Sequence, residues 1–205
     1  MWLEHFPERH LKIQVDVCVT GIGMVNTALQ LGNLLAWEDY DLAINAGVAG
    51  SFSNKIKIGT TVQVKQDCFA DFGVMNKDKF ETVFETGLVN KNEPPFKNGM
   101  LKPTSIKVNP ISKMKKVIGL TVNSVSGNAV QIKKLKKKFG AEIETMEGAA
   151  FFLACMQNNI PCLQIRSISN MIEVRNKKNW NIPFAVSSLN QTLIELLKNF
   201  NETEN

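Results

Sequence analysis

Apolar residues follow two different periods along the first quarter of the chain. Residues 13–20 (IQVDVCVT) alternate and are rich in β-branched residues, which predicts a strand, whereas residues 25–37 have the spacing of a helix. Glycines within 21–23 separate the two. A short apolar strand at 42–44, followed by a glycine turn at 45–50, begins a second cycle of the same kind.

The same order of strand and helix returns later in the chain. Further strands are expected at 60–65, 118–125, 142–145 and 162–168, and further helices at 129–139, 146–158 and 182–200. Between residues 67 and 110 the periodicity is weak, and we expect a long excursion over the surface. Strands that alternate with helices predict a single α/β domain over residues 1–205, with a largely parallel sheet.

Length and composition narrow the class of protein. The chain has 205 residues, of which 44% are hydrophobic and 21% are charged, and these values are typical of one folded domain and exclude overall disorder. No apolar run is long enough to predict a membrane span, and residues 1–9 are too polar for a secretory signal. A cytoplasmic protein is therefore expected.

The net charge of +5 comes largely from two lysine runs, at 113–116 and 133–138. The second run lies on an expected amphipathic helix, so its lysines should form the solvated face. No aromatic residues are interleaved with this charge, so nucleic-acid binding is not expected. The four cysteines are far apart in apolar surroundings, which predicts reduced core thiols and neither a metal site nor a disulfide framework.

Several strand ends should meet at the carboxyl edge of the sheet, where ligands of α/β proteins bind. These ends include Glu147 and Ser169 with Asn170. Glu147 could simply interact favourably with the dipole of the helix that follows it. However, the small residues at 148–150 should leave space for a ligand beside it, and a carboxylate can accept hydrogen bonds from both hydroxyls of a ribose. Asn170 is either a helix cap or a group that faces this edge.

Five ordered motifs resemble the purine nucleosidase branch of the nucleoside phosphorylase superfamily. They are residues 20–26 (TGIGMVN), 44–51 (INAGVAGS), 126–128 (SGN), 144–150 (ETMEGAA) and 166–170 (RSISN). The segments 69–73 (FADFG), 147–152 (EGAAFF) and 168–176 (ISNMIEVRN) resemble futalosine hydrolases of the menaquinone pathway more than methylthioadenosine/adenosylhomocysteine nucleosidases. The resemblance implies a three-layer nucleoside phosphorylase-like fold with a mixed, largely parallel central sheet.

The same resemblance implies hydrolysis of an N-glycosidic bond through an oxocarbenium-like sugar. By position, Glu147 would bind the ribose hydroxyls, Met146 would flank the sugar, and Ser169 and Asn170 would address the purine. Further expected substrate contacts are Gly47, Ala49, Phe69, Glu144, Phe151 and Arg175. Phe69 and Phe151 could stack on the base or could be core residues, and Arg175 could bind a substrate carboxylate or form a surface salt bridge with Glu173.

Asn170 departs from the adenine-specific pattern, in which an aspartic acid occupies this position. An amide can donate to O6 or N7 of a purine but cannot protonate the base as an acid. We therefore expect a 6-oxopurine nucleoside as substrate, with futalosine and release of hypoxanthine as the leading case. Asn128 stands where adenine-specific relatives have aspartate, which is compatible with the same change of substrate from an adenine nucleoside to a 6-oxopurine nucleoside.

The family pattern also includes an amino-terminal strand and a glutamate that activates the attacking water. Only residues 1–11 precede the expected strand at 13–20, and neither Glu4 nor Glu8 has the spacing to replace that glutamate. This departure from the family pattern raises the alternative of an inactive nucleoside-binding protein. The other alternative to futalosine hydrolysis, within the same family, is a methylthioadenosine/adenosylhomocysteine nucleosidase or a phosphorylase. No metal or organic cofactor is implied, and the superfamily resemblance implies a homodimer.

Overall fold

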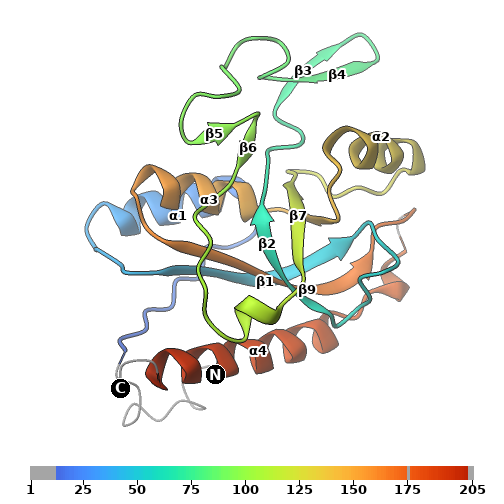
Figure 1. Ribbon diagram of the computed structural model, residues 1–205. Helices are drawn as coiled ribbons and strands as arrows, with labels where there is room; N and C mark the ends of the chain where they lie inside the picture. Colours follow the sequence, from blue (N-terminus) through green and yellow to red (C-terminus); the bar gives the residue numbers. More distant parts are fainter. Residues whose placement is uncertain (1–12, 175, 203–205) are drawn as a thin grey trace.

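The computed structural model describes residues 13–174 and 176–202, which form an α/β fold around a mixed five-stranded sheet (Figure 1). The strands are β1 (Ala43–Ser51), β2 (Thr61–Gln66), β7 (Lys116–Thr121), β8 (Ile143–Thr145) and β9 (Cys162–Met171). β1 with β9, β2 with β7, and β7 with β8 are parallel pairs, whereas β1 with β8 and β2 with β9 are antiparallel. The predicted mixed, largely parallel sheet is confirmed.

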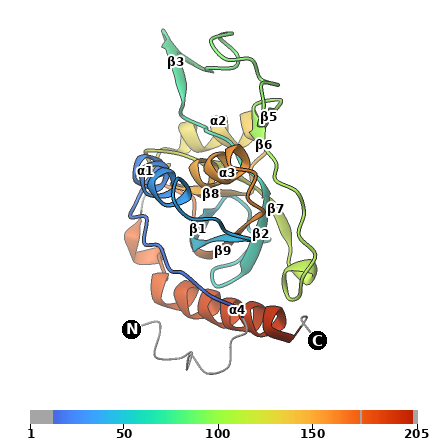
Figure 2. The same cartoon turned by 90° about the vertical axis from the view of Figure 1, so that its left-hand side faces the viewer.

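The sheet closes into a barrel with the strand order β1-β8-β7-β2-β9, which the sequence pattern did not indicate. Closure depends on two residue pairs between β1 and β8, Gly50 with Glu144 and Ser51 with Ile143. α1 (Met24–Leu35) and α3 (Gly148–Gln157) lie together on one side of the barrel, and α4 (Ile182–Glu202) covers the opposite side (Figure 2).

Helix α2 (Ala129–Phe139) has the predicted bounds because both of its ends are specified locally. The Asn128 side chain accepts hydrogen bonds from the backbone N–H groups of Val130 and Gln131, which is the usual N-cap contact, and Gly140 ends the helix in the left-handed conformation. Leu135 is buried, and the lysines are exposed, as predicted.

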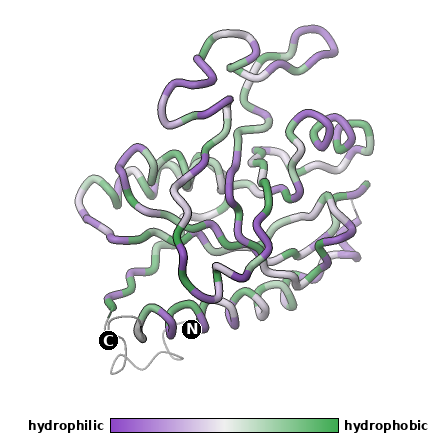
Figure 3. The backbone as a smooth tube through the Cα atoms, in the orientation of Figure 1, coloured by the Kyte–Doolittle hydropathy of each residue, from purple (hydrophilic) through white to green (hydrophobic). Residues whose placement is uncertain are grey.

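The excursion after β2 carries two small hairpins that extend away from the barrel (Figure 1). They are formed by β3 (Gly73–Asn76) with β4 (Lys79–Thr82), and by β5 (Phe96–Lys97) with β6 (Met100–Leu101). Asp67 and Leu101 exchange two backbone hydrogen bonds, of 3.0 and 2.9 Å, where the excursion leaves and rejoins the barrel. The weak periodicity of this region reflects its mostly hydrophilic surface hairpins (Figure 3).

Two of the predicted elements are wrong in this structure. Residues 13–20 form no strand, because no described strand pairs with them, and Val17 and Val19 are exposed. Residues 45–50 form no turn and instead continue strand β1, where they pair with β9 along almost its whole length. Alternation and glycine content report local preference, whereas strand formation requires a partner.

Apart from α2, the other predicted strands and helices are found with shifted ends. α1 begins at Met24, directly after Gly23, which has a φ of 92°. Cys68, Cys155 and Cys162 are buried and free, as predicted, whereas Cys18 is exposed on the segment before α1. Across residues 13–174 and 176–202, no helix combines the length and apolar character of a membrane span.

Candidate functional site

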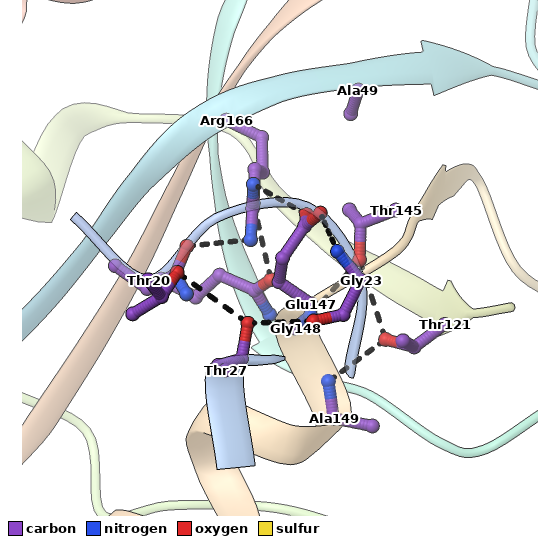
Figure 4. A network of polar contacts seen from close by, with 12 residues as sticks. Thr20, Gly23, Thr27, Ala49, Thr121, Thr145, Glu147, Gly148, Ala149 and Arg166 are labelled. Carbon is purple, nitrogen blue, oxygen red and sulfur yellow. Dashed lines mark hydrogen bonds and ion pairs between the residues drawn. The ribbon is translucent and has the colours of Figure 1, made fainter. Parts of the chain in front are cut away.

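Glu147 lies at the junction of β8 and α3, where it is the N-cap residue of α3. One carboxylate oxygen, Oε1, accepts a hydrogen bond of 3.1 Å from the backbone N–H of Gly23, and the other, Oε2, lies 3.4 Å from Nη1 of Arg166. Figure 4 shows the carboxylate between these two partners. The side chain keeps 18% of its surface exposed, so Glu147 is fixed by the protein and still accessible to a ligand.

Arg166 is a cation inside strand β9, with only 3% of its side chain exposed. Its guanidinium group donates to Asn45 Oδ1 on β1 through Nη2, and to Gln164 Oε1 through Nε at 3.2 Å. Burial lowers the pKa of Arg166, while the nearby Glu147 and Asp67 carboxyl groups oppose that shift. Such a buried cation requires paired charge and filled hydrogen bonds, and this arrangement supplies both.

Asp67 follows β2 and has no exposed surface. Oδ1 accepts hydrogen bonds from the Cys68 backbone N–H at 2.8 Å and from the Thr121 hydroxyl at 2.9 Å, and Oδ2 accepts one from Gln164 Nε2 at 2.9 Å. Burial raises the pKa of Asp67 to about 7, against the opposing effect of the hydrogen bonds from Thr121 and Cys68.

Two threonine hydroxyls hold the first turn of α3 below Glu147. The backbone N–H of Ala149 donates to Thr121 Oγ1 at 2.8 Å, and that of Gly148 donates to Thr145 Oγ1 at 3.1 Å (Figure 4). These contacts satisfy donors that a helix start leaves without intrahelical partners. The position of Glu147 is thus set by α3 as well as by its own two contacts.

The small residue after Glu147 serves a different purpose from the one expected. A Cβ atom on Gly148 would lie 2.1 Å from Gln164 Oε1 and 2.3 Å from Asp67 Oδ2. The space beside the backbone here is therefore filled by buried polar side chains, and the expectation that Gly148 opens room for a ligand is wrong. Gly47 is similar, because a Cβ there would lie 2.2 Å from Nη1 of Arg166.

Ser169 and Asn170 lie at the far end of β9, where the pairing with β1 shifts. Ala49 pairs with Ile168 and Gly50 pairs with Asn170, so Ser169 is an extra, bulged residue. Its hydroxyl lies 2.9 Å from Asn170 Oδ1 and 3.3 Å from the Ala49 carbonyl oxygen. Asn170 Nδ2 in turn donates to the Met171 carbonyl at 3.1 Å. The bulge and these contacts fix the direction of the Asn170 amide.

The amino-acid sequence matches a known family over most of its length. Residues 10–200 fit the model of the phosphorylase superfamily. The chain belongs to this superfamily. The nucleoside phosphorylase resemblance found in the sequence motifs is confirmed.

Individual relatives in the phosphorylase superfamily fall into two groups. A futalosine hydrolase from Thermus thermophilus is 31% identical over 180 residues, which are 87% of this chain and 79% of the relative. A 5'-methylthioadenosine/S-adenosylhomocysteine nucleosidase from Buchnera aphidicola is 29% identical over 195 residues, which are 91% of this chain and 79% of the relative.

Solved structures of the superfamily show the same fold. The Neisseria meningitidis 5'-methylthioadenosine/S-adenosylhomocysteine nucleosidase, in complex with methylthio-immucillin-A, aligns with a TM-score of 0.73 at 16% identity, over 96% of this chain and 94% of that one. The native futalosine hydrolase of Helicobacter pylori aligns with a TM-score of 0.63 at 18% identity, over 88% of this chain and 75% of that one. The predicted nucleoside phosphorylase-like fold is confirmed.

Several expected substrate contacts have structural roles in this superfamily member. Both carboxylate oxygens of Glu144 are engaged by Ser126, through its backbone N–H at 2.9 Å and its hydroxyl at 2.5 Å, so Glu144 anchors the loop before α2. Burial raises the pKa of Glu144. Phe151 is buried in the core cluster, which favours the alternative of a packing residue. Ala49 is also buried in that cluster.

Met146 and Phe69 stay predicted substrate contacts. Met146 is half-buried directly before Glu147, and Phe69 packs edge-on to Phe72 with ring centroids 6.2 Å apart. Arg175 lies outside the described residues, as do Glu4 and Glu8. Within the described part of the chain, no group of three or more His, Cys, Asp or Glu side chains could hold a metal ion.

Sequence reasoning gave no role to Arg166, Gln164 or Asp67. A signal was present for two of them, because Gln164 and Arg166 interrupt an otherwise apolar strand predicted to be buried on both faces. Charged and amide groups in such a strand require partners. Asp67 carried no comparable signal, since it stands at the start of a polar excursion.

The close contacts of Gly148 predict a stability difference between two glycine variants. Gly148→Ala should lower the free energy of unfolding by about 1–3 kcal/mol, because the added methyl group displaces Gln164 and Asp67. Gly32→Ala is the control, since nothing lies within 4 Å of that position in α1, and it should stabilise the protein by about 0.4–1 kcal/mol. Denaturant unfolding measures both values, and equal stability of the two variants would contradict the assignment.

Proposed function

We propose that this chain hydrolyses the N-glycosidic bond of a 6-oxopurine nucleoside, with futalosine as substrate and hypoxanthine as the released base. The observation that carries the proposal is the Glu147 carboxylate, which is fixed by Gly23 and Arg166 yet partly exposed at the start of α3. The relatedness to futalosine hydrolases supports the choice of substrate.

In the proposed reaction the bond from C1′ to the base nitrogen breaks, water adds to C1′, and the base leaves with a proton. The sugar becomes cationic as that bond breaks, so a fixed negative charge nearby stabilises the transition state. Each oxygen of Glu147 has one protein partner and can accept a further hydrogen bond from a ribose hydroxyl. Glu147 would therefore both orient the sugar and stabilise its charge.

Asn170 supplies the argument for an oxygen-bearing purine. The Ser169 hydroxyl faces its carbonyl oxygen, and one N–H of its amide donates to Met171, which leaves the second N–H to donate to a ligand. A donor at this position suits O6 or N7 of hypoxanthine, and a base with charge on these atoms is a better leaving group. The nucleosidases that act on methylthioadenosine and adenosylhomocysteine remain the second candidate, because relatives at 29% identity carry that name.

A panel of nucleosides separates these candidates. We expect the wild-type protein to release base from futalosine faster than from methylthioadenosine, and inosine to be cleaved without added phosphate, which distinguishes hydrolysis from phosphorolysis. Asn170→Asp should shift the ratio of kcat/KM values toward methylthioadenosine by about 10-fold or more, because the acid can protonate N7 and accept from a 6-amino group. Preferential release of adenine by the wild-type protein would refute the role of Asn170.

Removing the charge of Glu147 tests its place at the sugar. Glu147→Gln should lower kcat/KM by about 10²–10³-fold, because the neutral amide no longer stabilises the cationic sugar. Glu195→Gln, at an exposed position of α4, is the matched control and should retain activity. Undiminished hydrolysis by Glu147→Gln would mean that the ribose lies elsewhere. Calorimetry that shows nucleoside binding without turnover by the wild-type chain would favour the alternative of an inactive binding protein.

An exposed apolar face on α1 supports the expected homodimer. Val25 and Leu29 lie four positions apart on α1 and are 73% and 58% exposed, and Ile22, just before the helix, is 75% exposed. Apolar patches of this kind are uncommon on monomers and are typical of association surfaces, and twofold self-association is the commonest solution. Gly23, the partner of Glu147, directly precedes this helix, so the proposed interface would lie next to the site. Location in the cytoplasm stays a prediction.

The proposed dimer predicts a specific effect of charge on α1. Val25→Asp should convert the dimer to a monomer in sedimentation velocity experiments, because a carboxylate cannot be buried in the apolar interface without a partner. Val130→Asp introduces the same change on the exposed surface of α2, where Val130 is 63% exposed, and should leave the dimer intact. A monomeric wild-type protein, or equal effects of the two variants, would contradict this interface.

A further inference from the structure

A continuous line of hydrogen bonds connects the buried Asp67 to the accessible Glu147. Asp67 Oδ2 accepts from Gln164 Nε2 at 2.9 Å, Gln164 Oε1 accepts from Arg166 Nε at 3.2 Å, and Arg166 Nη1 lies 3.4 Å from Glu147 Oε2. A second line runs from Asp67 through the Thr121 hydroxyl to the Ala149 backbone N–H, in the first turn of α3. The first line thus ends at Arg166 and the second at the first turn of α3, and both of these position Glu147.

The first line has a fixed direction. An ionised Asp67 can only accept hydrogen bonds, so the NH₂ group of Gln164 must face it. The carbonyl oxygen of Gln164 then faces Arg166, whose guanidinium group can only donate. The negative charge of Asp67 thus determines which end of the Gln164 amide is presented to Arg166.

We propose that Asp67 is a positioning residue for Glu147, acting through the Gln164 amide on Arg166 and through Thr121 on the start of α3. The proposal rests on the function proposed above only where it predicts catalytic rates. Asp67 itself has no exposed surface and so does not touch a ligand. Its effect on the reaction would be transmitted entirely by the geometry of the Arg166 and Glu147 pair.

Protonation of Asp67 should reverse this direction. With a proton on Oδ2, the carboxyl group becomes a donor, the Gln164 amide turns to accept it, and its NH₂ group then faces Nε–H of Arg166. Two donors would meet, and Arg166 would lose its partner on β9. The pKa of Asp67, raised by burial to about 7, places this change in the neutral range.

Few other charged groups act on Asp67. The Arg166 cation favours the ionised form, and the Glu147 carboxylate disfavours it. The Cys68 thiol is adjacent, and burial raises its pKa, so it stays neutral. From β7 come the Thr121 hydroxyl and Gly119, and from α3 comes Gly148, none of which titrates.

A nuclear magnetic resonance titration tests the connection without using catalysis. In the wild-type protein, the Asp67 carboxyl carbon, the Gln164 side-chain amide and Arg166 Nε–H should all shift with one midpoint near pH 7. Asp67→Asn and Arg166→Lys assign the signals by their loss. In Gln164→Met the Arg166 signal should keep only a small response to the Asp67 titration, because the two charges still interact directly but the amide no longer connects them. An Arg166 signal that is insensitive to Asp67 in the wild-type protein, or that follows it with an undiminished shift in Gln164→Met, would overturn the proposal.

Kinetics then test the consequence for hydrolysis. Activity of the wild-type protein should fall as the pH is lowered through about 7, because protonation of Asp67 releases Arg166. Gln164→Met and Asp67→Asn should lose this inflection and lower kcat about 10- to 100-fold at pH 8, as expected for a misplaced catalytic group. Gln63→Met is the matched control, since Gln63 is also a buried strand glutamine, and it should keep the wild-type pH profile.

The two proposals fail in different ways. If futalosine is not hydrolysed but the three signals titrate together, the proposed substrate is wrong and the positioning role of Asp67 stands. If futalosine is hydrolysed with an unchanged pH profile in folded Gln164→Met, the function stands and the positioning role is wrong. The wild-type titration does not depend on Gln164→Met, so the proposal can still be refuted by that titration if the Gln164→Met protein does not fold.

Discussion

The arrangement of the site depends on the burial of one carboxyl group, that of Asp67. A carboxyl group out of contact with water must find hydrogen-bond donors in the protein, and Asp67 takes them from the Cys68 backbone, Thr121 and Gln164. Cys68 follows β2, Thr121 lies on β7 and Gln164 lies on β9. The hydrogen bonds of a single buried group therefore connect β7 and β9 to the start of α3, and the partly exposed Glu147 is built on that connection.

Three glycines around the site matter because they lack a side chain and so leave space for neighbouring polar groups. Gly47 makes room for Arg166, Gly148 for Gln164 and Asp67, and Gly119 for Asp67, because a Cβ atom would lie within 3 Å of these side chains. None of the three has a positive φ, so an alanine backbone would be acceptable at each. A positive φ is instead found at Gly21 and Gly23, with values of 80° and 92°, where the chain enters α1.

Features with local signals could be predicted from the sequence, and features that depend on distant partners could not. The bounds of α2 follow from Asn128 and Gly140, which act within one turn of the helix. The strand predicted at 13–20 and the turn predicted at 45–50 were wrong because strand pairing joins residues far apart in the chain. The contact of Gln164 with Asp67 spans 97 residues, so no local pattern reveals it. Glu147 and Asn170 were found through motif resemblance, and their contacts emerge only in three dimensions.

Two backbone hydrogen bonds between Asp67 and Leu101 hold together the two ends of the excursion after β2. The entropy of closing a loop grows only slowly with its length, by about 0.6 kcal/mol for each doubling. Insertions or deletions in the hairpins between these residues should therefore be tolerated by the barrel. Evolution can therefore reshape this outer part of the molecule while the buried polar groups next to it, such as Asp67, stay unchanged.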